Sequence, residues 1–386
     1  MAASEELGII GVDSYHFFVN NPARSRSFYE RFGFRPVARS GDAMTEETGQ
    51  ASVVYSAGGT GRAATQVVVS TPQRTTCRAA RYLKRHPAGI GSISFQVADL
   101  DKAWRFLTAR DATPIHSIRE TRRGDARYRH FSITTALGDV AYRFVEREGW
   151  EGFAPGFDAL EATNAPPAPF KALGIDHITS NAPTMAPMKL WLEHVLGMEQ
   201  CWSIEFHTED VKSGAASGTG LKSVVMWDPR SGLKFPINEP LQPFFKDGQI
   251  NKFVEENSGA GVQHIAIEVD DIVSAVRSLR TRGVGFLETS GAYYDQAPGR
   301  LAKKDVDVAA LQHRLEHLRE LGILIDGKPH NRYLIQIFLK DAATLYAEPD
   351  AGPFFYELIQ RCGDDGFGEG NFRALFESIE RIQEDV

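Results

Sequence analysis

The chain has few cysteines, no long apolar run and no excess of positive charge. Its 386 residues include three cysteines, which are too few and too far apart for a disulfide framework or a zinc motif. No segment approaches the roughly 18 apolar residues that span a bilayer, and the N-terminus does not resemble a signal peptide. The formal net charge of -7 argues against nucleic acid or an anionic membrane as the main partner. We therefore expect a cytoplasmic protein in a reducing compartment, with neither of these partners.

An internal repeat is the main feature that the sequence does contain. Segment 9–37 is predicted to form a strand, an Asn-Asn-Pro turn, a helix that ends at Gly33, and a second strand. Segment 172–200 has the same order, and segment 89–107 matches segment 261–279. Repetition on this scale indicates a duplicated fold.

The repeat also predicts the domain organisation. At 386 residues the chain is long enough for two domains with large cores. Residues 154–170 are rich in proline and alanine and have no periodicity, which is typical of a linker. We predict a first domain at 1–153, this linker, and a second domain at 171–386.

Three polar side chains stand on apolar, strand-like runs of the second half. Glu357 follows two phenylalanines, and in strand alternation it shares a face with Phe355. His177 lies in GIDHITSN and His264 in GVQHIAIEV. Two imidazoles and one carboxylate suit a divalent iron with open coordination positions. The alternatives are that Glu357 pairs with an arginine and that both histidines are ordinary core residues.

The repeat provides an internal control for this hypothesis. Ser14 and Ser92 stand at the positions of the two histidines, and a weaker match of 141–147 with 355–361 places Arg143 opposite the glutamate. Serine binds metals poorly and arginine does not bind them. Both halves are therefore expected to share an architecture, with a metal site in the second half alone.

Several motifs of the second half resemble one family. GIDHITSN, FPINEP, GVQHIAIEV, YLIQIF, FFYELIQR and GFGEGNFRALFESIE together are similar to 4-hydroxyphenylpyruvate dioxygenases and to the related 4-hydroxymandelate synthases. The resemblance covers the chain from about residue 172 to its end. It implies an α+β fold of the vicinal oxygen chelate group, with duplicated βαβββ modules that form two open barrel-like domains. The active site would lie in the C-terminal barrel, closed by a C-terminal helix.

The resemblance also implies a reaction. Fe(II) would be held by His177, His264 and Glu357, and the substrate, 4-hydroxyphenylpyruvate, would supply its own 2-oxo acid. With O2 it would give homogentisate and CO2, a step of tyrosine catabolism. The family pattern further implies a homodimer or homotetramer.

The same resemblance assigns residues to the substrate. A polar wall would orient it, Gln336 would lie near the metal, aromatic rings would sandwich the substrate ring, and Pro236 would contact the substrate. The polar wall is Ser223, Asn238, Gln249 and Gln263, and the aromatic rings are Phe338, Phe367 and Phe372. Gln263 points away from its neighbour His264 in a regular strand, so its reach into the site requires a local distortion. The alternative for the polar residues is turn and strand-end polarity, and for the rings an ordinary core.

Other functions remain open from the sequence. The resemblance implies that a bulky Phe338 accompanies attack on the ring, which favours the dioxygenase over the synthase. A dioxygenase acting on another 2-oxo acid and a non-catalytic binding protein of the same fold are the further alternatives. Three departures from the family pattern are expected near the pocket: the long segment 339–353, Gly248, and an insertion within 214–223.

Overall fold

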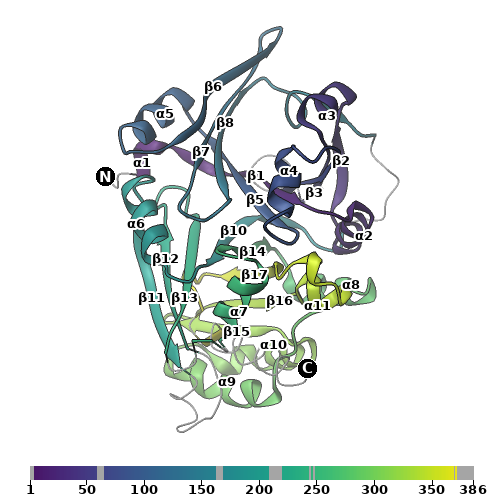
Figure 1. The fold of residues 1–386 in the computed structure, drawn as a ribbon. Helices are drawn as coiled ribbons and strands as arrows, with labels where there is room; N and C mark the ends of the chain where they lie inside the picture. Colours follow the sequence, from purple (N-terminus) through teal and green to yellow (C-terminus); the bar gives the residue numbers. More distant parts are fainter. Residues whose placement is uncertain are drawn as a thin grey trace.

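The fold consists of two curled sheets, one from each half of the chain, with helices around them (Figure 1). The computed structural model describes residues 4–58, 65–161, 168–207, 220–242, 245–246, 248–368 and 370–371. In Figure 1 the N-terminal half lies above the C-terminal half. In this part of the chain, no helix is long and apolar enough to cross a membrane.

The N-terminal sheet has nine strands in the order β6-β7-β8-β5-β1-β4-β3-β2-β9. Their bounds are β1 Ile9–Phe18, β2 Arg35–Ser40, β3 Gln50–Ala57, β4 Thr65–Pro72, β5 Gly89–Val97, β6 Pro114–Arg123, β7 Ala126–Thr134, β8 Ala141–Glu148 and β9 Phe157–Ala159. The short β9 comes from the predicted linker and pairs with β2. Residues 157–159 therefore extend the N-terminal sheet, a pairing that the local sequence does not indicate.

The C-terminal sheet has eight strands in the order β11-β12-β13-β10-β14-β17-β16-β15. Their bounds are β10 Ala172–Asn181, β11 Glu199–His207, β12 Gly220–Trp227, β13 Lys234–Pro240, β14 Gly261–Val269, β15 Leu324–Lys328, β16 Arg332–Phe338 and β17 Phe355–Cys362. If β1 to β8 are renumbered as β10 to β17, the two strand orders are identical. The duplicated α+β fold predicted from the sequence is therefore confirmed.

Several of the helices begin or end at recognisable capping residues. Their bounds are α1 Ser4–Leu7, α2 Pro22–Phe32, α3 Asp42–Thr48, α4 Arg78–Leu83, α5 Leu100–Thr108, α6 Ala186–His194, α7 Gln249–Glu256, α8 Ile272–Thr281, α9 Gly291–Lys303, α10 Val308–Leu321 and α11 Ala342–Tyr346. Asp99 caps α5 and Asp271 caps α8, each accepting a backbone N–H in the first turn. Gly33 ends α2 in the left-handed region, as the sequence predicts.

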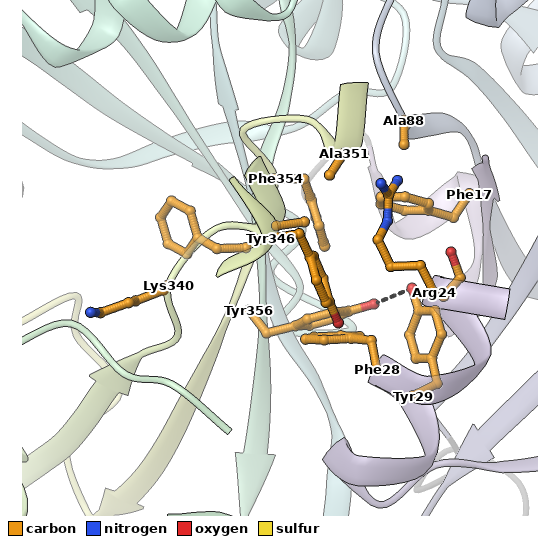
Figure 2. A pocket seen from close by; sticks show the side chains of 13 residues that line it. Phe17, Arg24, Phe28, Tyr29, Ala88, Lys340, Tyr346, Ala351, Phe354 and Tyr356 are labelled. Carbon is orange, nitrogen blue, oxygen red and sulfur yellow. Dashed lines mark hydrogen bonds between the residues drawn. The ribbon is translucent and has the colours of Figure 1, made fainter. Parts of the chain in front are cut away.

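Aromatic side chains join the two halves around Tyr356 of β17. Its hydroxyl hydrogen-bonds those of Tyr15 and Tyr29, at 2.8 and 3.0 Å, and all three are buried. Figure 2 shows Tyr356 lying against Phe28 and Tyr29 of α2, and the ring of Phe28 stacks on it at 6.0 Å between centroids. Because the two halves share this packing, they form one continuous hydrophobic core.

Segment 339–353 also lies at this junction, so its expected position near the pocket is wrong. It contains α11, and Tyr346 and Ala351 line the junction pocket of Figure 2 beside Phe17 and Arg24 of the N-terminal half. Arg24 pairs with Glu348. The extra length of this segment therefore serves contact between the halves. The predicted closing helix, with Phe372, lies outside the described residues.

Candidate metal centre

The three predicted ligands lie on three adjacent strands of the C-terminal sheet. His177 is on β10, His264 on the neighbouring β14, and Glu357 on β17. The ladder pairs Ala266 of β14 with both His177 and Glu357. In a sheet, ladder partners have side chains on the same face. This register brings residues that are 87 and 93 positions apart in sequence to one place.

The ligand atoms form a compact triangle. The Nε2 atoms of His177 and His264 are 3.4 Å apart, and Glu357 Oε2 lies 3.2 Å from the first and 3.4 Å from the second. All three side chains are buried. Neighbouring ligands bound at about 2.1 Å to one ion lie about 3.0 to 3.4 Å apart in octahedral or tetrahedral geometry. The arrangement therefore has the size of a coordination site.

Hydrogen bonds direct both imidazoles at the centre of the triangle. The Nδ1 of His177 lies 2.8 Å from Asp176 Oδ1, and the Nδ1 of His264 lies 3.1 Å from Gln263 Oε1. Each oxygen accepts the Nδ1–H, so the lone pair of each imidazole is on Nε2. The other carboxylate oxygen of Glu357, Oε1, is buried and has no hydrogen-bond partner among the described residues.

The pair formed by Asp176 and Arg361 was missed by the sequence reasoning. Arg361 donates to both carboxylate oxygens of Asp176, at 2.5 and 2.8 Å, and to the carbonyls of Asp364 and Gly366. The arginine thus holds the carboxylate that orients His177. The sequence did contain a signal for this pair. In both repeats an aspartate precedes the first central position, and an arginine follows the third by four residues.

The charges at this centre are balanced in favour of an ionised carboxylate. Burial opposes ionisation, but His177 and His264 hold the pKa of Glu357 below its ordinary value. Burial likewise opposes ionisation of Asp176, yet Arg361 and His177 hold its pKa well below the usual range. Burial also disfavours the charged form of His177, but Glu357 and Asp176 together raise its pKa.

The expected distortion at Gln263 is present in the sheet. The β10–β14 ladder shifts between Thr179–His264 and Ser180–Val262, which makes a bulge at Gln263. Gln263 is buried and lines the narrow pocket at the triangle, although its sequence neighbour His264 lines it too.

The other polar-wall residues lie on β12, β13 and α7. Ser223 and Asn238 are ladder partners, and both are buried. Asn238 donates to Asn181 at 2.9 Å, whereas Asn238 Oδ1 and Ser223 Oγ have no partner within the described part of the chain. Gln249 is buried at the start of α7. Unsatisfied buried oxygens are costly. Asn238 and Gln263 line the narrow pocket at the triangle, whereas Ser223 and Gln249 are not among its lining residues.

Two of the predicted aromatic residues lie at the pocket. Phe338 is the ladder partner of Glu357, and its ring is 6.2 Å from that of His264. The ring of Phe367 is 4.8 Å from that of His177. Gln336 and Ile359 also line this pocket. Pro236 is buried two positions before Asn238 on β13, but it is not among the residues that line the pocket.

Comparisons with known proteins agree with this architecture. The family model described as Glyoxalase/Bleomycin resistance protein/Dioxygenase superfamily matches residues 11–138 and 174–297. The chain is 33% identical to 4-hydroxyphenylpyruvate dioxygenase of Yarrowia lipolytica, over 97% of this chain and 92% of the relative. It is 33% identical to the dioxygenase of the same name from Dictyostelium discoideum, over 97% and 98%.

A solved structure extends the comparison to three dimensions. A triple mutant of 4-hydroxymandelate synthase from Streptomyces coelicolor superposes with a TM-score of 0.77 at 26% identity, covering 97% of this chain and 99% of the other.

Proposed function

The chain belongs to the 4-hydroxyphenylpyruvate dioxygenase family of the Glyoxalase/Bleomycin resistance protein/Dioxygenase superfamily, and we propose that it converts 4-hydroxyphenylpyruvate and O2 to homogentisate and CO2 with Fe(II). One observation carries this proposal: His177, His264 and Glu357 direct three ligand atoms at one buried point. The reaction balances: the carboxyl group of the 2-oxo acid leaves as CO2 with its own two oxygens, one atom of O2 completes the new carboxylate at the former keto carbon, and the other enters the ring.

The residues present fit a divalent iron. His177 Nε2, His264 Nε2 and Glu357 would hold it, a set of two imidazoles and one carboxylate typical of oxygen-activating iron sites. When bound, Fe(II) would supply open positions for a chelating 2-oxo acid and for O2, and would pass electrons from the substrate to O2. Glu357 Oε1 has no partner among the described residues, which fits a carboxylate reserved for a cation.

The supporting residues have positioning roles in this proposal. Arg361 holds Asp176, and Asp176 in turn holds His177 in the tautomer that presents Nε2. Gln263 acts in the same way on His264. Because the imidazoles are fixed before a ligand arrives, binding costs little side-chain entropy.

The proposed substrate would lie between the aromatic and polar walls. Phe338 and Phe367 would contact the ring of the substrate, since both lie beside the ligand imidazoles. Ser223 Oγ and Asn238 Oδ1 would accept the phenolic hydrogen bond, with Gln249 nearby at the start of α7. Most of the residues that line the pocket are buried, which strengthens these polar contacts.

A second candidate is the synthase reaction, which gives 4-hydroxymandelate from the same substrate. This candidate is supported by the similarity of the fold to that of a 4-hydroxymandelate synthase. Phe338 favours the dioxygenase, because it places a bulky ring next to Glu357. A cytoplasmic location and a homodimer or homotetramer stay predictions.

Product analysis tests the proposal. The chain is loaded with Fe(II) and ascorbate, supplied with 4-hydroxyphenylpyruvate and O2, and its products are separated by chromatography and identified by mass. We expect homogentisate and CO2 in equal amounts, with none from the metal-free chain. 4-Hydroxymandelate as the main product would favour the synthase. Fe(II) bound without either product would contradict the proposed substrate.

A further inference from the structure

The N-terminal sheet contains a counterpart of the metal centre in which a cation replaces the carboxylate. Arg143 of β8 is the ladder partner of Ser94, just as Glu357 of β17 is the partner of Ala266. Ser94 in turn pairs with Ser14, as Ala266 pairs with His177. The register thus confirms the sequence alignment and places a guanidinium where the other half has its acidic ligand.

Polar residues surround Arg143 at the positions that correspond to the proposed site residues of the C-terminal half. The ladders give these counterparts: Ser52 for Ser223, Ser70 for Asn238, His130 for Gln336, Ser132 for Phe338 and Ser92 for His264. Arg78 is the first residue of α4, as Gln249 is of α7. We call the residues Ser14, Ser52, Ser70, Arg78, Ser92, Ser94, His130, Ser132 and Arg143 the N-terminal polar face. Its serines are buried.

The positive charge of this face is not neutralised. Arg143 has no hydrogen bond or ion pair with any described residue, and its Nε is buried without a partner. Arg78 donates to the carbonyl of Gly91 at 2.7 Å and forms no ion pair in the described part of the chain. The nearby carboxylates are already engaged. Asp139 pairs with Arg85 and His86, and Asp13 pairs with Arg147.

Two neighbouring histidines have lowered pKa values, to which these arginines contribute. Burial, followed by Arg78 and Arg143, lowers the pKa of His16 to about 3. Burial and then Arg143 lower the pKa of His130 to about 3 as well. Both imidazoles are therefore neutral at pH 7 and retain one N–H each. Arg119, an exposed ladder partner of His130, adds a cation at the edge of the face.

We infer that the N-terminal polar face binds a small oxyanion, a carboxylate or phosphate group, with Arg143 as its charged ligand. A guanidinium presents a planar fork that matches two oxygens of such a group. Ser94 and Ser132 flank Arg143 on the neighbouring strands, so their hydroxyls can donate to the same anion. A cation that is partly withdrawn from water without a counterion is costly, and an anion would remove that cost.

This site is independent of the proposed reaction, because it lies in the other half of the chain and uses no metal ligand. Inorganic phosphate and acetate are suitable probes, since neither is a 2-oxo acid. Each is titrated into the full chain carrying isotope-labelled histidine, and the ring signals of His16 and His130 are followed by NMR. We expect saturable shifts of both with at least one of the two anions, while exposed His313 stays unchanged.

Variants identify the ligand. Arg143→Gln should weaken binding by at least about tenfold, the loss expected for a charge-assisted contact. Arg122→Gln removes an equal charge from an exposed site on β6 and should leave the affinity unchanged. Arg143→Lys keeps the charge without the fork and should bind with intermediate affinity, which separates loss of the ligand from loss of the fold.

The two probes also distinguish the source of the oxyanion. Saturation by phosphate alone would identify a phosphate site, and saturation by acetate alone a carboxylate site. Saturation by neither anion in the unmodified chain would overturn the inference, whatever the variants do. Equal affinity in folded Arg143→Gln would overturn it as well.

Discussion

The two halves share a backbone and one supporting ion pair, but they differ in the side chains at the centre. Asp13 pairs with Arg147 in the N-terminal sheet as Asp176 pairs with Arg361 in the C-terminal sheet. In each half the aspartate precedes the first central position, and the arginine follows the third by four residues. The supporting ion pair is thus present in both halves, whereas the His-His-Glu triangle is present only in the C-terminal half of the described residues.

This difference shows that the fold does not determine the chemistry of the centre. Glu357 of β17 and Arg143 of β8 occupy equivalent ladder positions in the two sheets. The exchange of a carboxylate for a guanidinium at this position changes the local charge by two units. The C-terminal centre then attracts a cation, and the N-terminal face repels one. Function therefore depends on the site and not on the sheet that carries it.

The largest effect is expected from removal of the carboxylate at the proposed metal centre. Glu357→Gln keeps the volume and removes the charge, so bound Fe(II) and turnover should both be lost. We expect turnover to fall by more than about 100-fold, because loss of a ligand should exceed the 10- to 100-fold loss typical of a supporting partner. Metal content per chain and homogentisate formation measure this.

An exposed glutamate serves as the control for this variant. Glu316→Gln on α10 makes the same substitution on a side chain that is 71% exposed, and it should leave both measurements unchanged. Retained turnover in Glu357→Gln would remove this glutamate from the proposed ligand set.

The supporting pairs allow a matched comparison between the halves. Asp176→Asn weakens the acceptor for the His177 Nδ1–H, so metal affinity should fall about 10- to 100-fold. Asp13→Asn makes the same change beside Ser14 and should leave metal affinity unchanged. Competition with a chelator measures both. Equal losses in the two variants would mean that the aspartates act through stability and not through the imidazole.

Much of this arrangement could be predicted from the sequence, for identifiable reasons. His177, His264 and Glu357 stand on apolar runs where a polar side chain is conspicuous, and the serines and arginine of the first half made the contrast visible. The distortion at Gln263 followed from simple strand alternation. These features are local, or they repeat within the chain.

The remaining features depend on long-range contacts that no local pattern encodes. Asp176 and Arg361 are 185 positions apart in sequence, and either could have had another partner. Segment 339–353 was expected at the pocket because of its sequence position, yet it packs on Arg24 across the junction. The α9 helix contains Pro298. Because proline lacks a backbone N–H donor and is unfavourable inside a helix, the sequence did not indicate a helix here.

The junction between the halves predicts an effect on stability. Tyr356→Phe leaves the buried hydroxyls of Tyr15 and Tyr29 without their shared partner, so the free energy of unfolding should fall by about 1 to 3 kcal/mol. Metal content should not change, because Tyr356 lies on the opposite face of β17 from Glu357. Denaturant unfolding measures the first and metal analysis the second.

A half-buried tyrosine at the same junction provides the control. Tyr346→Phe removes a hydroxyl that accepts from Arg31 near the surface, and it should cost less than about 0.5 kcal/mol. A larger loss in Tyr346→Phe than in Tyr356→Phe would contradict the role assigned to the buried hydroxyl network.

The smallest expected effect comes from grafting the ligands onto the N-terminal half. The triple variant Ser14→His, Ser92→His and Arg143→Glu reproduces the three ligand types on equivalent strands, and Asp13 is in place to orient the first histidine. Residue 91 is a glycine where the other half has Gln263, so the second histidine would lack its partner. We therefore expect a second, weaker site, measured as Co(II) absorption that rises beyond one ion per chain.

The decisive control for the graft keeps Arg143. With the two histidines alone, the guanidinium should repel the ion, and Co(II) binding should stay at one per chain. The exchange of charge at that one ladder position would then account for the difference between the halves. If the folded triple variant also binds a single ion, equivalent ladder positions do not carry equivalent ligand geometry, and the curvature of each sheet must contribute to the site.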